Sequence, residues 1–95
     1  MYAVVRIYSG PGAKQFFDIL EKRKEDLEAA HQHVKGIMSY TLLRSEDGGV
    51  AVTVCREKAG AHDSVRVAKE WLEKNAPGVA TDPPQLIEGA VIIHV

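Results

Sequence analysis

The histidines are the first residues to consider for chemistry, because their spacing decides whether they can bind a metal ion together. The 95-residue chain has four of them. His31 and His33 stand two positions apart, so on a helix they point to different faces and do not share a metal ion. His62 and His94 have no carboxylate or cysteine at a zinc-like spacing. We therefore expect no metal site.

His62 and Asp63 are adjacent near the start of a predicted helix, which leaves two interpretations open. They could form an oriented acid–base pair. Alternatively, Asp63 is a solvated first-turn acid that the helix dipole favours. We favour the second interpretation.

Two other features resemble chemical motifs and are interpreted as structural. Gly10-Pro11-Gly12-Ala13-Lys14 joins a strand to a helix, but it is too short for a phosphate loop and has no Ser or Thr after the lysine. We expect a turn there. Cys55, the single cysteine, falls in the middle of a strand and is expected to be a small buried residue with an unactivated thiol.

Composition places the chain among ordinary globular domains and excludes several classes of partner. Residues 1–95 suffice for one domain, with 45% apolar and 26% charged residues. The formal net charge of −1 and the pI of about 6.4 offer no basis for binding nucleic acid or an anionic membrane. No apolar run approaches a membrane span, no signal peptide is visible, and a lone cysteine favours a reducing compartment. We expect a cytoplasmic protein.

Strand-like and helix-like periods alternate along the chain in the order βαββαβ. The predicted strands are 2–8, 37–43, 50–56 and 87–95, and the predicted helices run from 13 to about 33 and from 60 or 61 to 75. Right-handed crossovers and a short hairpin favour the strand order 4-1-3-2. The fold class is thus α+β and ferredoxin-like, a four-stranded antiparallel sheet with two helices on one face.

Buried stripes and turns accompany these elements. The expected stripes are Phe16, Leu20, Leu27, His31 and Val34 in the first helix, and Ala61, Val65, Ala68 and Leu72 in the second. Gly36 is expected to end the first helix. Ser45-Glu46-Asp47-Gly48-Gly49 is expected to supply the hairpin turn, because its glycines adopt positive φ at no steric cost.

Both faces of the sheet carry apolar residues, although helices can cover only one. The third strand has Val50, Val52 and Val54 on one face and Ala51, Thr53 and Cys55 on the other. A large exposed apolar face is unusual for a monomer, and an apolar edge strand also favours pairing. We expect a homodimer, with either Ile92 or Ile93 of the last strand in the interface.

Arg6 and Glu88 are charged residues in strands expected to be neighbours. Placed on the face without helices, they could pair in the barrel interior or across the dimer, as buried charges require. One or both could instead reach solvent at a strand end.

The first strand, the Lys35-Gly36-Ile37 start of the second, the Gly48-Gly49 hairpin and the stretch 56–61 resemble the dimeric α+β barrel superfamily, and within it the antibiotic biosynthesis monooxygenase-like proteins. The resemblance spans nearly the whole chain. It implies a ferredoxin-like fold and a dimer, within a superfamily of cofactor-independent oxygenases, haem-degrading enzymes and isomerases. Members with oxygenase or haem-degrading activity use an asparagine in the first strand and a tryptophan early in the second helix. Here Arg6 stands near the former place and Trp71 falls late, where we expect it to pack.

Two functions remain open. In the first, a pocket between helices and sheet binds, and in an enzyme would oxidise, a small apolar or aromatic molecule without a bound cofactor. Its expected lining is Phe17, Met38, Tyr40, His62 and Trp71. In the second, the domain is a non-catalytic ligand-binding or assembly module. A closed, dry core near Tyr40 and Trp71 would favour the module.

Overall fold

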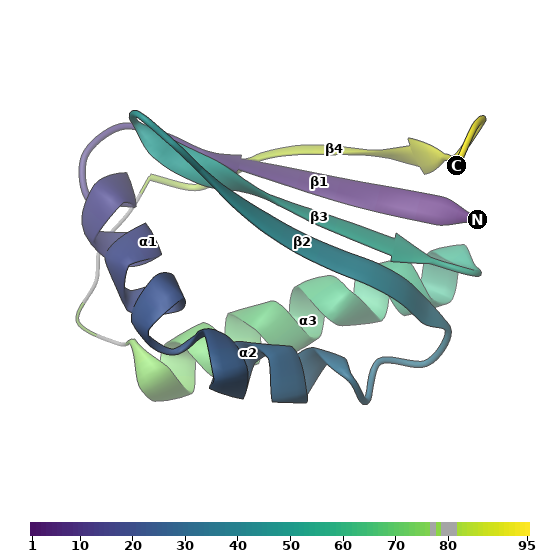
Figure 1. Cartoon of the computed structure of the whole chain (residues 1–95), viewed down its shortest axis with the longest axis horizontal. Coiled ribbons are helices and arrows are strands. Elements are labelled where there is room, and N and C mark those ends of the chain that lie inside the picture. Colours follow the sequence, from purple (N-terminus) through teal and green to yellow (C-terminus); the bar gives the residue numbers. More distant parts are fainter. Residues whose placement is uncertain (77, 79–81) are drawn as a thin grey trace.

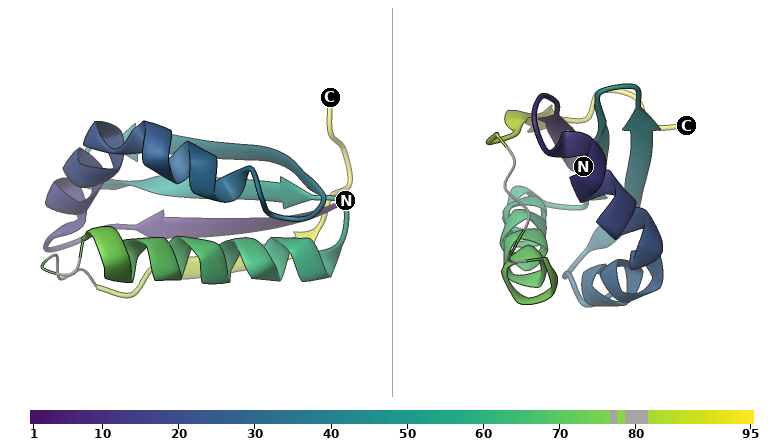
Figure 2. Two further views of the ribbon diagram at one scale, coloured as in Figure 1. Left: turned by 90° about the horizontal axis from the view of Figure 1, so that it is seen from below. Right: turned by 90° about the vertical axis from the view of Figure 1, so that its left-hand side faces the viewer.

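The computed structural model describes residues 1–76, 78 and 82–95. The elements along the chain are β1 (Tyr2–Tyr8), α1 (Ala13–Lys22), α2 (Lys24–His31), β2 (Ile37–Ser45), β3 (Gly48–Cys55), α3 (Lys58–Asn75) and β4 (Gln85–Ala90). The strands form one antiparallel sheet in the order β2-β3-β1-β4, as predicted. Figure 1 and Figure 2 show α1, α2 and α3 on one face of this sheet, and the described residues place no helix on the other. The ferredoxin-like α+β class is confirmed.

Strand alternation decides which side chains meet the helices. In β1, Val4, Arg6 and Tyr8 point toward the helices and are buried. Their partners in β3 are Thr53, Ala51 and Gly49. Cys55 stands two positions after Thr53 in the same strand, so its side chain lies on the same buried face. The valines of β3 lie on the opposite face, as the alternation predicts.

The core consists of two apolar clusters between the sheet and the helices. The larger is aromatic: the ring centroids of Tyr8 and Phe16 are 4.9 Å apart, and those of Phe16 and Phe17 are 5.6 Å apart. The smaller centres on Val4 and Cys55. The larger cluster therefore rests on Tyr8 of β1, and the smaller rests on Val4 of β1 and Cys55 of β3.

The prediction of one long first helix is wrong, because the backbone breaks at Arg23. Arg23 has φ −110° and ψ 24° and separates α1 from α2. Its Nη2 donates to Asp26 Oδ2 at 2.7 Å and to Asn75 Oδ1 at 2.9 Å, and its guanidinium lies 5.7 Å from the centroid of Trp71. These contacts hold the break and turn α2 toward α3. The predicted stripe is nevertheless buried on both helices.

The second predicted helix begins earlier than expected and is rotated about its axis. It starts at Lys58 and ends, as predicted, at Asn75. Its buried residues are Ala61, Ser64, Ala68 and Trp71, while Val65 and Leu72 of the predicted stripe are only half-buried. Burial of the Trp71 side chain, the largest on this helix, turns the stripe.

The prediction that Gly48 and Gly49 supply positive φ is also wrong. Both lie in β3, the turn being Glu46 and Asp47, and neither has a positive φ. They are glycines because of close packing. A Cβ on Gly48 would stand 2.4 Å from Tyr8 O, and one on Gly49 would stand 2.3 Å from Phe17 Cε2.

The last strand stops at Ala90 rather than Val95, so the prediction that Ile92 and Ile93 share it is wrong. β4 is the edge strand predicted, and among the described strands it pairs with β1 alone, which begins at Tyr2. The Val91 N–H donates to the carbonyl of Met1 at 3.0 Å. Beyond that bond β1 offers no backbone to pair with. Within the described part of the chain, no helix has the length and apolarity that a bilayer span requires.

Candidate functional site

A cavity of about 540 Å³ lies between β1, Phe16 of α1, the part of α3 from Val65 onward, and the two prolines that precede β4. The described residues that line it are Arg6, Tyr8, Phe16, Val65, Lys69, Leu72, Ala76, Pro83 and Pro84. Its size falls within the range of about 300–1,000 Å³ typical of small-molecule sites. Strand alternation turns Arg6 and Tyr8 of β1 toward the helices, and the packing of α1 and α3 encloses the space at one end of the sheet.

The closed interior, on the side of Tyr40 that faces Arg6 and Ala51, is nearly filled. The space bordered by Arg6, Tyr40 and Ala51 measures only about 10 Å³, which is room for about one water molecule. This is the feature expected of a filled module. The larger cavity adjoins it, however, and shares Arg6, Tyr8, Phe16 and Leu72 with it.

Arg6 stands where the closed interior meets the larger cavity. It is 6% exposed, and its β-sheet partners are Ala51 and Leu86. Among the described residues it forms no ion pair with a carboxylate. Burial raises the pKa of the Tyr40 phenol, and the nearby Arg6 charge lowers it in part. Arg6 is thus a buried cation beside a neutral hydroxyl.

The structure does not pair Arg6 with Glu88, and it places both on the helix-facing side rather than on the bare face. Val4, not Arg6, is the strand partner of Glu88. Glu88 Oε1 accepts a hydrogen bond from the Tyr2 hydroxyl at 2.8 Å and lies 2.9 Å from His62 Nε2. The bond to His62, followed by that to Tyr2, lowers the pKa of Glu88. These contacts occupy the carboxylate at the sheet edge.

His31 and Tyr40 form a buried stack that the sequence showed only as part of a helical stripe. Their ring centroids are 3.8 Å apart at an interplanar angle of 16°. His31 Nδ1 lies 2.9 Å from Leu27 O, so this nitrogen carries the proton and donates it. His31 Nε2 is then an acceptor, and it has no partner among the described residues. Burial lowers the pKa of His31, which keeps the ring neutral.

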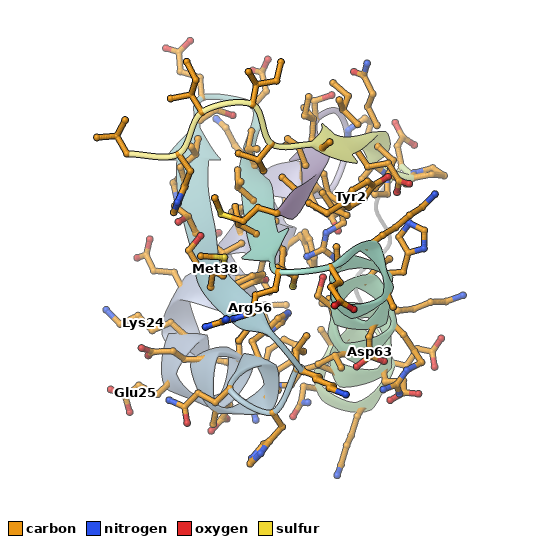
Figure 3. All side chains as sticks on the ribbon, turned by 90° about the vertical axis from the view of Figure 1, so that its right-hand side faces the viewer. Tyr2, Lys24, Glu25, Met38, Arg56 and Asp63 are labelled. Carbon is orange, nitrogen blue, oxygen red and sulfur yellow. The ribbon has the colours of Figure 1, made fainter. Side chains whose placement is uncertain are left out.

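Of the five predicted pocket residues, Met38 and Tyr40 border one cavity of about 260 Å³, which Phe17, His62 and Trp71 do not line. Tyr40 borders the closed interior, and Trp71 and Phe17 are core residues. Met38 is 44% exposed at the start of β2, where Figure 3 labels it. His62 lies at the sheet edge beside Glu88. Their role in binding stays a prediction, and Trp71 packs in the core as expected.

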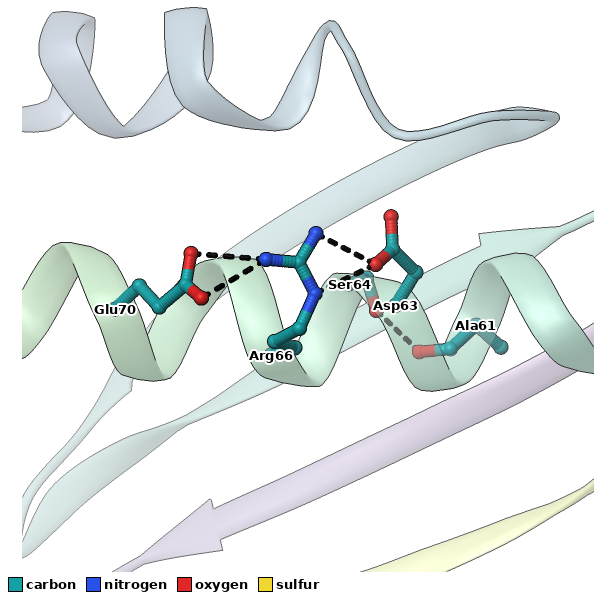
Figure 4. A network of polar contacts seen from close by, with 5 residues as sticks. All are labelled: Ala61, Asp63, Ser64, Arg66 and Glu70. Atoms are coloured by element: carbon teal, nitrogen blue, oxygen red, sulfur yellow. Dashed lines mark hydrogen bonds and ion pairs between the residues drawn. The ribbon is translucent and has the colours of Figure 1, made fainter.

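His62 and Asp63 do not form an acid–base pair. Asp63 Oδ1 accepts from Arg66 Nη2 at 2.7 Å, and Arg66 Nη1 donates to both oxygens of Glu70 at 2.9 Å (Figure 4). This is a network along the surface of α3. The alternative interpretation, a solvated first-turn acid that the helix dipole favours, is also wrong, because α3 begins at Lys58 with no acid in its first turn and Asp63 lies in an ion pair.

A second cavity, of about 500 Å³, opens at the other end of the molecule. Its described lining is Lys35, Gly36, Arg56, Glu57, Ala59, Gly60 and Asp63. Arg56 and Asp63, from the β3–α3 loop and α3, are labelled there in Figure 3. Acids and bases alternate around it and no aromatic side chain lines it, so it lacks the features of a site for an apolar ligand. The described residues contain no group of three His, Cys, Asp or Glu that could hold a metal ion.

No protein-family model matches the chain, and no curated protein matches it in sequence. Solved structures do match. One is a variant of MhuD with two manganese protoporphyrin IX molecules bound per active site (TM-score 0.70, 20% identity, covering 99% of this chain and 96% of that one). Another is a dimeric ferredoxin-like protein from an uncultured marine organism (TM-score 0.66, 13% identity, covering 99% and 94%). A third is the monooxygenase from the gene ActVA-Orf6 of Streptomyces coelicolor in complex with nanaomycin D (TM-score 0.58, 18% identity, covering 98% and 91%).

The chain shares their ferredoxin-like fold. Two further matching structures are described as antibiotic biosynthesis monooxygenases, so the resemblance to such proteins is confirmed at the level of the fold. At these identities the likeness establishes the fold alone.

Proposed function

We propose that this protein is a homodimer that binds a small, largely aromatic molecule in the cavity between β1, α1 and α3. The observation that carries the proposal is the cavity of about 540 Å³. Tyr8 and Phe16 supply aromatic walls, Val65 and Leu72 supply apolar ones, and a few polar tips remain to orient a ligand.

The bare face of the sheet supports the dimer. By register it carries Val5, Ile7, Val50, Val52, Leu43 and Ile87. Leu43 and Ile87 are 47% and 51% exposed in the single chain. Such a face is best covered by another apolar surface. A second copy offers one by symmetry, and a structural neighbour of this fold is described as dimeric.

Binding has more support than oxidation. A monooxygenase-like reaction without a bound cofactor would require the substrate to supply the electrons that reduce O₂. The described lining of the cavity has no carboxylate or histidine to remove a proton from such a substrate. Oxygen consumption with a bound aromatic substrate is therefore the observation that would add the enzymatic function.

The test is an NMR titration of the wild type with benzyl alcohol, a neutral aromatic probe. We expect amide shifts to concentrate around the cavity. Val65→Trp should weaken them, because Val65 lines the cavity and the larger indole takes up part of the space that the probe would occupy. Val67→Trp is the matched control, since Val67 is also half-buried on α3 but lies outside that lining.

Absence of any cavity shifts in the wild type at millimolar probe would contradict the proposal. It would favour the alternative of a non-catalytic assembly module. The closed space of about 10 Å³ beside Tyr40 is the observation that supports that alternative.

A further inference from the structure

We propose that the cavity selects aromatic monocarboxylates, with the ligand carboxylate bound by the guanidinium of Arg6. This inference rests on the proposed binding function and names the chemical class of the ligand. It assigns Arg6 as the residue that determines specificity.

The first argument is the uncompensated charge of Arg6. A guanidinium keeps its proton in proteins, so burial does not neutralise it. Buried charges are normally paired, because removing an ion from water without a partner is costly. Arg6 is 6% exposed, yet the ion pairs of the described residues do not include it. A bound anion would provide the missing partner.

The second argument is the sign of the cavity lining. Besides Arg6, its only charged member among the described residues is Lys69, an exposed residue of α3. No acid belongs to that lining. At the sheet edge Glu88 bonds to Tyr2 and His62, and on α3 Asp63 pairs with Arg66. The described lining of the cavity therefore carries positive charge alone, which favours an anionic ligand.

The third argument is the combination of one buried guanidinium with apolar walls. A guanidinium matches a carboxylate with parallel N–H···O bonds. Phe16 and Tyr8 border the same space and would face an aromatic ring attached to that carboxylate. A phosphate dianion needs more hydrogen-bond donors than the buried guanidinium of Arg6 and the exposed ammonium of Lys69 provide. A monocarboxylate with an aromatic body fits these groups best.

The experiment measures the affinity of the wild type for benzoate, benzyl alcohol and phenyl phosphate by NMR titration. Benzoate should bind about tenfold or more tightly than benzyl alcohol. The reason is that hydrogen bonds between a guanidinium and a carboxylate contribute more free energy than a tenfold difference in affinity requires. Phenyl phosphate should bind more weakly than benzoate. Arg6→Met should remove the preference for benzoate while benzyl alcohol still binds. Arg56→Met is the matched control and should leave the preference unchanged, because Arg56 lies outside this cavity.

A second readout does not depend on the folding of a variant. In the wild type, saturating benzoate should shift the side-chain Nε–Hε resonance of Arg6 and leave that of Arg56 in place. Equal affinity for benzoate and benzyl alcohol, or an unmoved Arg6 resonance, overturns the inference and leaves the binding function intact. Failure to bind any of the probes overturns the proposed function itself. Tighter binding of phenyl phosphate than of benzoate overturns the choice of carboxylate.

Discussion

Val52→Asp provides the sharpest test of the dimer. Val52 lies at the centre of the bare face, in the interior strand β3, with Val5 and Thr41 as its partners on either side. In a face-to-face dimer its side chain would be fully covered. In a monomer it would remain half-buried at the surface, so a carboxylate there could still reach water.

The size of the effect follows from the geometry of the sheet. Strands about 4.8 Å apart and a 7-residue β1 rising about 3.3 Å per residue give a flat footprint of roughly 440 Å². Because side chains project from this flat area, the accessible surface that each subunit would bury is larger than the footprint. It approaches the roughly 800 Å² per partner of a standard interface. An uncompensated buried charge costs about 3 kcal/mol, and two-fold symmetry buries two, for about 6 kcal/mol. The dimer dissociation constant should therefore rise by roughly four powers of ten.

Sedimentation velocity over a concentration series is the assay. We expect a dimeric wild type at tens of micromolar and a monomeric Val52→Asp variant with an unchanged far-UV spectrum. Ala29→Asp is the control, because Ala29 is exposed on α2, in the helical layer, and it should remain dimeric. A monomeric wild type, or a Val52→Asp variant that stays as tightly associated as the wild type, would refute the reasoning.

Three further predictions concern stability and reactivity. Gly49→Ala should lower the free energy of unfolding by about 1–3 kcal/mol in urea, because its Cβ would stand 2.3 Å from Phe17 Cε2, whereas Gly78→Ala, with no atom within 4 Å, should change it little. The free energy of unfolding should fall as the pH drops below 6.5, the ordinary pKa of histidine. Burial lowers the pKa of His31 in the folded protein, so below pH 6.5 the unfolded chain binds a proton there that the folded chain does not. Urea unfolding across pH should show a smaller slope for His31→Gln but not for the exposed His33→Gln; equal slopes would contradict this. Burial raises the pKa of Cys55, so its thiol should react with a disulfide reagent only after unfolding, and rapid reaction of the native protein would contradict its placement.

Local patterns predicted the framework well. Tyr2–Tyr8 is a strand in both the prediction and the structure, and α3 ends at Asn75 as expected, because these features depend on neighbours in sequence. The break at Arg23 depends on Trp71 and Asn75, which are distant in sequence. No local periodicity could show it.

The candidate site was less predictable for the same reason. Tyr40 was expected near a pocket and borders the closed interior, but Phe17, Met38 and His62 lie elsewhere. Residues that share a sheet face or helix stripe can be identified from sequence. Which of them meet across layers depends on the rotation of each helix, and the burial of Trp71 set that of α3.

The sequence by itself determined the βαββαβ order, the strand order and the excess of apolar surface on the sheet, since strand alternation and helical period are local properties. Only the tertiary structure decided that Arg6 faces the helices and lies beside a cavity without a carboxylate partner among the described residues. Alternation places Arg6 on one of two faces. The packing of helices on one of those faces is what buries it, and burial turns an ordinary surface charge into one that requires a partner.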